Sequence, residues 1–169
     1  QPPSGPGNAR VSWSPDSTIA YSGTGQSPGV ALDESAFSHS LDGGNHWEQI
    51  SLIDTAITLT DIAAAPSPKS LFAATASIVG PESVWRSAGE PLGRYWARIL
   101  TMNTASDKVI LRLSPNYATD YTLYAAEVGG NQIAVTHTRG NSWNVRRTMG
   151  AVTDMAVADR DTVYIAAGT

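Results

Sequence analysis

Several features are scarce or missing in this sequence, and each absence excludes a class of protein. There is no cysteine among the 169 residues, which excludes disulfide scaffolds, thiol catalysis and cysteine-based zinc sites. Charged residues make up only 15% and the net charge is -4, so the chain lacks the basic face that nucleic acid requires. No apolar run approaches the roughly 18 to 20 residues of a membrane-spanning helix. We therefore expect a folded domain with no nucleic-acid partner and no membrane span.

The 3.6-residue periodicity of amphipathic helices is also almost absent. Short apolar segments instead alternate with turns rich in glycine and proline, of which there are 15 and 10. Four of these segments carry an aromatic residue among small ones: Tyr21, Phe72, Tyr124 and Tyr164. These aromatics lie 51, 52 and 40 positions apart, and a period of roughly 40 to 50 residues is typical of propeller blades or solenoid arrays.

A second series of residues has the same period. Trp47, Trp96 and Trp143 each begin a short strand, 49 and 47 positions apart. Each is preceded by another strand that ends in a hydroxyl residue, namely Ser40, Ser87 or Thr136. Two independent series with one period predict a repeated unit of four short strands. A β-sandwich with coincidental repetition is the alternative.

A four-stranded antiparallel unit of this length is the blade of a β-propeller. We therefore predict an all-β fold with about three and a half blades. Closed propellers usually carry about four to eight blades, so we expect a segment of a longer propeller, with completion of the ring by another chain as the alternative. The predicted organisation is a linker or N-terminal extension over 1–9, blades over 10–51, 58–100 and 107–148, and the first two strands of a fourth blade over 152–169.

One turn carries a recognisable motif. The segment from Ser40 to Trp47 reads SLDGGNHW and matches S-x-D-x-G-x-x-W. On this motif the chain resembles the Asp-box, or BNR-repeat, β-propellers. In such a hairpin the Asp42 carboxylate accepts backbone N–H groups, Gly44 supplies permissive dihedral angles, and the tryptophan packs on the neighbouring strand. The resemblance implies that Asp42 is structural and lies opposite the usual substrate face.

Two further copies of the motif depart from the pattern. The third unit has Thr138 where the aspartate is expected, and the second unit has Gly89 there and two extra residues before its tryptophan. We reject a metal or proton-transfer site at Asp42 because His39 and His46 lie across a hairpin without a third ligand. The predicted structural Asp-box residues are Ser40, Asp42, Gly44, Trp47, Ser87, Gly93, Trp96, Thr136, Gly140 and Trp143.

Binding residues are expected on the loops between the second and third strands of each unit, because loops carry function more often than strands do. The longest such loop, 23–34, ends with Asp33 and Glu34, the best carboxylate pair in the sequence. A plain acidic surface loop is the alternative. Trp13 and Trp85 lie within alternating strands, so we expect them in the core between blades rather than on a carbohydrate-binding platform.

The Asp-box fold serves sialidases, xyloglucan-degrading hydrolases, sortilin-type receptors and photosystem assembly factors, so the resemblance implies architecture better than activity. We expect a non-catalytic scaffold or protein-binding module that is secreted or on the cell surface. No catalytic residue, metal or cofactor is predicted. Other propeller blades or protein subunits are the expected partners, with carbohydrate as a further candidate. The alternative is part of a sialidase-like or xyloglucanase-like glycoside hydrolase with two carboxylates about 5 to 9.5 Å apart over the axial cleft.

Overall fold

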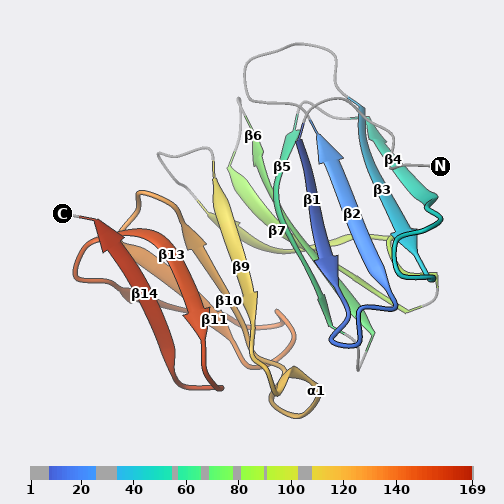
Figure 1. Ribbon diagram of the computed structural model, residues 1–169. Coiled ribbons are helices and arrows are strands. Elements are labelled where there is room, and N and C mark those ends of the chain that lie inside the picture. Colours follow the sequence, from blue (N-terminus) through green and yellow to red (C-terminus); the bar gives the residue numbers. More distant parts are fainter. Residues whose placement is uncertain are drawn as a thin grey trace.

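Antiparallel strands make up almost all of the regular secondary structure (Figure 1). Among the described residues, three sheets have four strands each and a fourth sheet has two. Strands that are consecutive in sequence pair with one another, so each sheet is an up-and-down meander. The prediction of an all-β fold made of four-stranded antiparallel units is confirmed. The computed structural model describes residues 8–25, 34–54, 57–65, 69–77, 81–89, 91–102 and 108–168.

The sheets follow one another along the chain, and β1 starts two residues before the first predicted blade. The first sheet holds β1 (Asn8–Trp13), β2 (Ala20–Gly25), β3 (Glu34–Ser40) and β4 (Glu48–Asp54). The second holds β5 (Ile57–Ala65), β6 (Ser70–Ser77), β7 (Glu82–Ala88) and β8 (Ala97–Met102). The third holds β9 (Val109–Leu113), β10 (Leu123–Glu127), β11 (Gln132–Thr136) and β12 (Asn144–Arg147), and the fourth holds β13 (Ala151–Val157) and β14 (Val163–Gly168).

A short helix interrupts this pattern once in the described part of the chain. It is α1 (Tyr117–Asp120), a single turn within the connection between β9 and β10. No helix among the described residues is long and apolar enough to cross a membrane.

The first three strands of the third sheet are buried on both faces. In β9, Val109 and Leu111 belong to the apolar cluster shared with the second sheet, whereas Ile110 between them belongs to the cluster shared with the fourth sheet. Successive side chains of a strand point to opposite faces, so a sheet packed on both sides needs an almost continuous apolar run. This requirement explains why the strand sequences of this unit lack a clear polar and apolar alternation.

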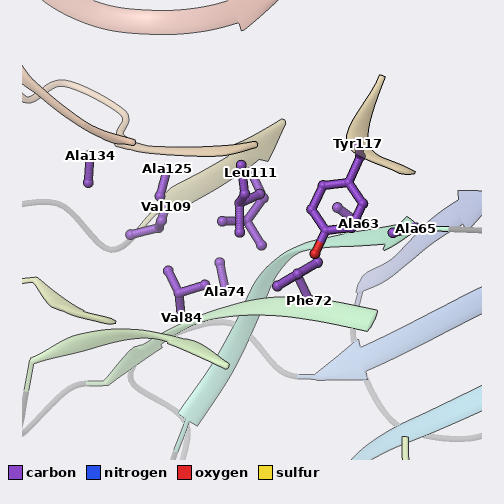
Figure 2. Packing of buried hydrophobic residues seen from close by; sticks show 11 residues of the cluster. Ala63, Ala65, Phe72, Ala74, Val84, Val109, Leu111, Tyr117, Ala125 and Ala134 are labelled. Atoms are coloured by element: carbon purple, nitrogen blue, oxygen red, sulfur yellow. The ribbon is translucent and has the colours of Figure 1, made fainter. Parts of the chain in front are cut away.

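Small residues allow the sheets to approach closely. Ala63 and Ala74 of the second sheet share one cluster with Ala125 and Ala134 of the third, and the fully buried Phe72 belongs to the same cluster (Figure 2). The first strand of the second sheet, β5, lies against β1 and β2 on one side and β9 on the other. The first strands therefore converge, while the later strands of each sheet spread outward.

The hairpins that follow the first and third strands of each sheet share one face of the molecule. In Figure 1 the β1–β2 connection and α1 both lie at the lower edge. Residues of the turns in the first and second sheets also line one common recess, which is described below. We call this side the turn face. It comprises the described turns at 14–19, 41–47, 91–96, 114–122, 137–143 and 158–162.

Candidate functional site

The turn after β3 is held by the side chains at both ends of its motif. The Ser40 hydroxyl accepts a hydrogen bond from the Gly44 N–H (2.8 Å) and donates one to Asp42 Oδ1 (2.9 Å). Asp42 Oδ1 also accepts from the His46 N–H (2.9 Å). The Trp47 indole closes the turn by donating to the Gly44 carbonyl (3.0 Å), and Gly44 has a φ of 87° that favours glycine.

Groups of this turn stabilise the negative charge on Asp42. The His46 backbone N–H, the His46 side chain and the Ser40 hydroxyl lower the pKa of Asp42 to about 2. A carboxyl group that donors hold in its ionised form is a poor proton donor near neutral pH. The geometry at Asp42 is thus that of a structural carboxylate.

The corresponding turn after β11 uses a hydroxyl where the first turn uses a carboxylate. Thr136 Oγ1 accepts from the Gly140 N–H (2.9 Å), as Ser40 does from Gly44. Thr138 Oγ1 accepts from the Ser142 N–H (3.0 Å), which is the bond that Asp42 makes with His46. A threonine therefore supplies the same acceptor without the charge.

The turn after β7 keeps two of the bonds despite its extra residues. Ser87 Oγ accepts from the Gly93 N–H (2.8 Å), and the Trp96 indole donates to the Gly93 carbonyl (2.7 Å). The tryptophan of the third unit behaves differently, because the Trp143 indole donates to the carbonyl of Ile99 in the preceding sheet (2.8 Å). This bond joins the third sheet to the second.

The predicted acidic loop falls mostly outside the described residues. Asp33 lies outside them, and Glu34 is described only as the first residue of β3. The two aromatic residues predicted in the core differ from each other. Trp85 is partly buried against the apolar cluster of the second sheet, as expected. The expectation was wrong for Trp13, which is 46% exposed and packs over Gly44 of its own sheet.

A charged network that sequence reasoning missed joins the first strands of three sheets. Arg112 of β9 donates to Asp61 Oδ2 of β5 (2.9 Å), to Asp154 Oδ1 of β13 (2.8 Å) and to the Met155 carbonyl (3.1 Å). The Leu111 N–H also donates to Asp61 Oδ2 (2.8 Å). One guanidinium group therefore holds both carboxylates.

The surroundings of Asp154 favour its ionised form. Its pKa is lowered by the Met155 backbone N–H and by Arg112. A signal for the two acidic positions was present in the sequence, because Asp61 and Asp154 both follow a threonine at matching places in TDIA and TDMA. The arginine between them had no such signal, since the third unit has no aspartate at that place.

An apolar recess of about 430 Å³ opens on the turn face between the first and second sheets. Cavities of roughly 300 to 1,000 Å³ with a mostly apolar lining and a few polar groups are typical of ligand sites. The first sheet contributes Ser14, Pro15, Asp16, Ile19, Tyr21, His39 and Leu41 to its wall. The second sheet contributes Ala64, Ala65, Lys69, Pro91 and Leu92.

Most polar groups of the recess come from the first sheet, and Lys69 comes from the second. His39 meets Tyr21 edge to face, with ring centroids 6.4 Å apart, and its Nε2 lies 3.3 Å from Glu48 Oε2. The Ser14 hydroxyl and the Thr18 backbone N–H lower the pKa of Asp16, so its carboxylate stays charged at the rim. Leu41 is 65% exposed and extends the apolar wall outward.

Across residues 8–25, 34–54 and the later described segments, no group of three or more His, Asp or Glu side chains is placed to hold a metal ion. Asp61 of β5 and Asp154 of β13 are both bound by Arg112.

The arrangement of sheets is similar to that of two solved structures, although no family model and no curated protein matches the sequence. The GH74 enzyme of Niastella koreensis, a β-propeller glycoside hydrolase, matches 93% of this chain with a TM-score of 0.65 and 16% identity. YCF48 bound to a D1 peptide, another propeller, matches 95% with a TM-score of 0.55 and 18% identity. The fold is that of a β-propeller.

Each four-stranded sheet is accordingly one blade, and the two-stranded sheet is half of one. The chain spans 25% of the GH74 enzyme and 47% of YCF48. The Arg112 network joins the inner strands of blades 2 and 3 to the half blade, whereas the apolar recess lies between blades 1 and 2 on the turn face. The two candidate sites are therefore separate in the fold.

Proposed function

We propose that this chain is a non-catalytic protein-binding module in an extracellular or cell-surface assembly. We place its binding surface on the turn face, and not on the loops between second and third strands that the sequence predicted. The observation that supports this proposal is the apolar recess between blades 1 and 2, with the exposed Leu41 at its rim. Apolar anchors that enter a desolvated pocket supply most of the binding energy at protein interfaces. The recess offers such a pocket.

We also assign the turns after β3, β7 and β11 to the Asp-box type. Their shared feature is a hydroxyl side chain that accepts the N–H of a later glycine, seen at Ser40, Ser87 and Thr136. Each of these bonds joins two residues of one hairpin, so they support a role in shaping the turn face rather than in catalysis. The peptide bound to YCF48, a propeller of 18% identity, supports peptide binding as a use of this fold.

A second candidate function is glycoside hydrolysis, because the GH74 enzyme has the same fold and because Asp61 and Asp154 lie near the converging inner strands. A hydrolase needs one carboxylic acid with a raised pKa beside a second carboxylate. The pKa of Asp154 is lowered instead, and Arg112 binds both groups. This chemistry suits a structural clamp better than proton donation.

One pair of experiments separates the two functions. A random peptide library displayed on phage is selected against the whole chain, and the enriched peptides are titrated against wild type, Leu41→Asp and Met149→Asp. Both variants replace an exposed apolar side chain with a carboxylate, but Met149 lies between β12 and β13, away from the recess. We expect Leu41→Asp to weaken binding and Met149→Asp to leave it unchanged.

The enzyme assay uses sialosides and xyloglucan oligosaccharides as substrates, with Asp61→Asn and Asp154→Asn as the variants. The module hypothesis predicts no turnover that depends on either carboxylate. Turnover by wild type that disappears in one of these variants would establish the hydrolase instead. Equal peptide binding by wild type and Leu41→Asp would remove the turn face from the proposal.

A further inference from the structure

The aromatic residue of each second strand occupies the same structural position in blades 1 and 2. Tyr21 lies between Ser12 and His39 in the register of the first sheet. Phe72 lies between Ala63 and Arg86 in the register of the second. Both rings face the following blade, since Tyr21 packs against the cluster of blade 2 and Phe72 against residues of blade 3.

Between blades 2 and 3, the space over this aromatic residue is filled from within the chain. Tyr117 of α1 is only 3% exposed, and its ring meets Phe72 edge to face with centroids 5.7 Å apart. Figure 2 shows the tyrosine above Phe72 and beside Ala63 and Ala65. An aromatic side chain is thus the group that fits between blades 2 and 3 over the aromatic residue of the second strand.

Among the described residues, the corresponding space between blades 1 and 2 is the recess. Tyr21 and His39, the counterparts of Phe72 and Arg86, both line it. The hairpin that supplies Tyr117 has six residues between Ser114 and Tyr121, whereas its counterpart in blade 2 has three, between Ala65 and Lys69. The shorter hairpin contains no aromatic residue.

We propose that the recess binds an aromatic side chain of a protein partner. This inference rests on the proposed protein-binding function and names the group that is recognised. The apolar residues Leu41, Ala64 and Leu92 would surround the ring, and Tyr21 would meet it edge to face as Phe72 meets Tyr117.

The contact that the recess would reproduce is made by a ring and not by a phenol oxygen. Burial raises the pKa of the Tyr117 hydroxyl, and that hydroxyl has no hydrogen-bond partner among the described residues. The fit between blades 2 and 3 therefore comes from the aromatic ring.

The experiment is a titration of the ¹⁵N-labelled full chain with N-acetyl-phenylalanine amide, followed by two-dimensional NMR. The tyrosine and leucine amides are titrated in parallel. We expect shifts at Tyr21, His39 and Ala64, with the phenylalanine and tyrosine amides binding about tenfold more tightly than the leucine amide. Leu41→Asp weakens the binding and the control Met149→Asp does not.

Binding of all three amides with equal affinity, or shifts that avoid the recess, overturns the inference. If selected peptides bind at the recess without an aromatic residue, the inference fails while the protein-binding function stands. If the amides bind as expected but no peptide does, the protein-binding function fails instead.

Discussion

Gly140 offers a sharp test of how blades 2 and 3 fit together. Its φ is 88°, and a Cβ atom placed on it would lie 2.5 Å from Cδ1, 3.1 Å from Cβ and 3.3 Å from Cγ1 of Ile99 in β8. Rotation of the isoleucine can move its Cδ1, but its Cβ moves only with the backbone. That backbone is held in place because the Trp143 indole donates to the Ile99 carbonyl. Gly140→Ala therefore has little room to relax.

The magnitude follows from comparison with Gly89, which has a nearly equal φ of 86° and nothing within 4 Å of an added Cβ. Gly89→Ala carries only the cost of a left-handed backbone, about 1 to 2 kcal/mol. Gly140→Ala carries the same cost and adds overpacking of about 1 to 3 kcal/mol. We expect the second variant to be the less stable of the two by that additional amount.

The assay is urea unfolding of wild type, Gly89→Ala, Gly140→Ala and the double variant Gly140→Ala with Ile99→Ala. Truncating Ile99 removes the atoms that the new methyl group meets, so the two substitutions should be coupled by about 1 kcal/mol or more. Equal destabilisation by Gly89→Ala and Gly140→Ala, with no coupling to Ile99, would refute the close contact between these blades.

Three further predictions follow from individual contacts. Hydrogen-bond donors in its turn lower the pKa of Asp42 to about 2, so its contribution to stability is present above pH about 4 and is lost as the pH falls toward 2. In acid unfolding, we expect Asp42→Thr to keep the turn but to lose this pH dependence. A variant whose stability depends on pH as that of wild type does would contradict the assignment. Arg112→Met leaves Asp61, whose side chain is 17% exposed, without its cation. We expect the free energy of unfolding, measured by chemical denaturation, to fall by about 2 to 4 kcal/mol and to be largely restored by the added change Asp61→Asn. An unchanged denaturation midpoint in Arg112→Met would contradict the network. Tyr117→Ala removes a buried ring, which lowers the free energy of unfolding by about 3 to 5 kcal/mol, and opens a second recess. N-acetyl-phenylalanine amide should therefore raise the melting temperature of this variant more than that of wild type. Equal shifts in melting temperature would contradict the equivalence of the two spaces.

Much of the fold is readable from local patterns. The two residue series led by Tyr21 and Trp47 have one period because each blade repeats the same four strands, and the short strands recur with turns between them. Local reading was less successful for Trp13. It lies in an alternating strand, but in the first blade its ring covers Gly44 and remains 46% exposed.

The candidate sites were harder to read because their residues come from different repeats. Arg112 binds Asp61 and Asp154, which lie 51 and 42 positions away. The recess combines Tyr21 and Leu41 of blade 1 with residues of blade 2. A motif search within one hairpin detects Ser40 and Gly44, which bond to each other, but it does not detect groups that meet only when two blades pack.

The amino-acid sequence by itself determined the strands, their meander order and the repeated hairpins, because these depend on side-chain alternation and on turn residues close together in the chain. Only the tertiary structure decided where a gap between blades is filled and where it stays open. A hairpin with three additional residues carries Tyr117, which lies over Phe72, whereas among the described residues the space over Tyr21 is a recess. The difference is a matter of packing between neighbouring sheets, and packing depends on side chains that are distant in sequence and become neighbours only in the folded chain.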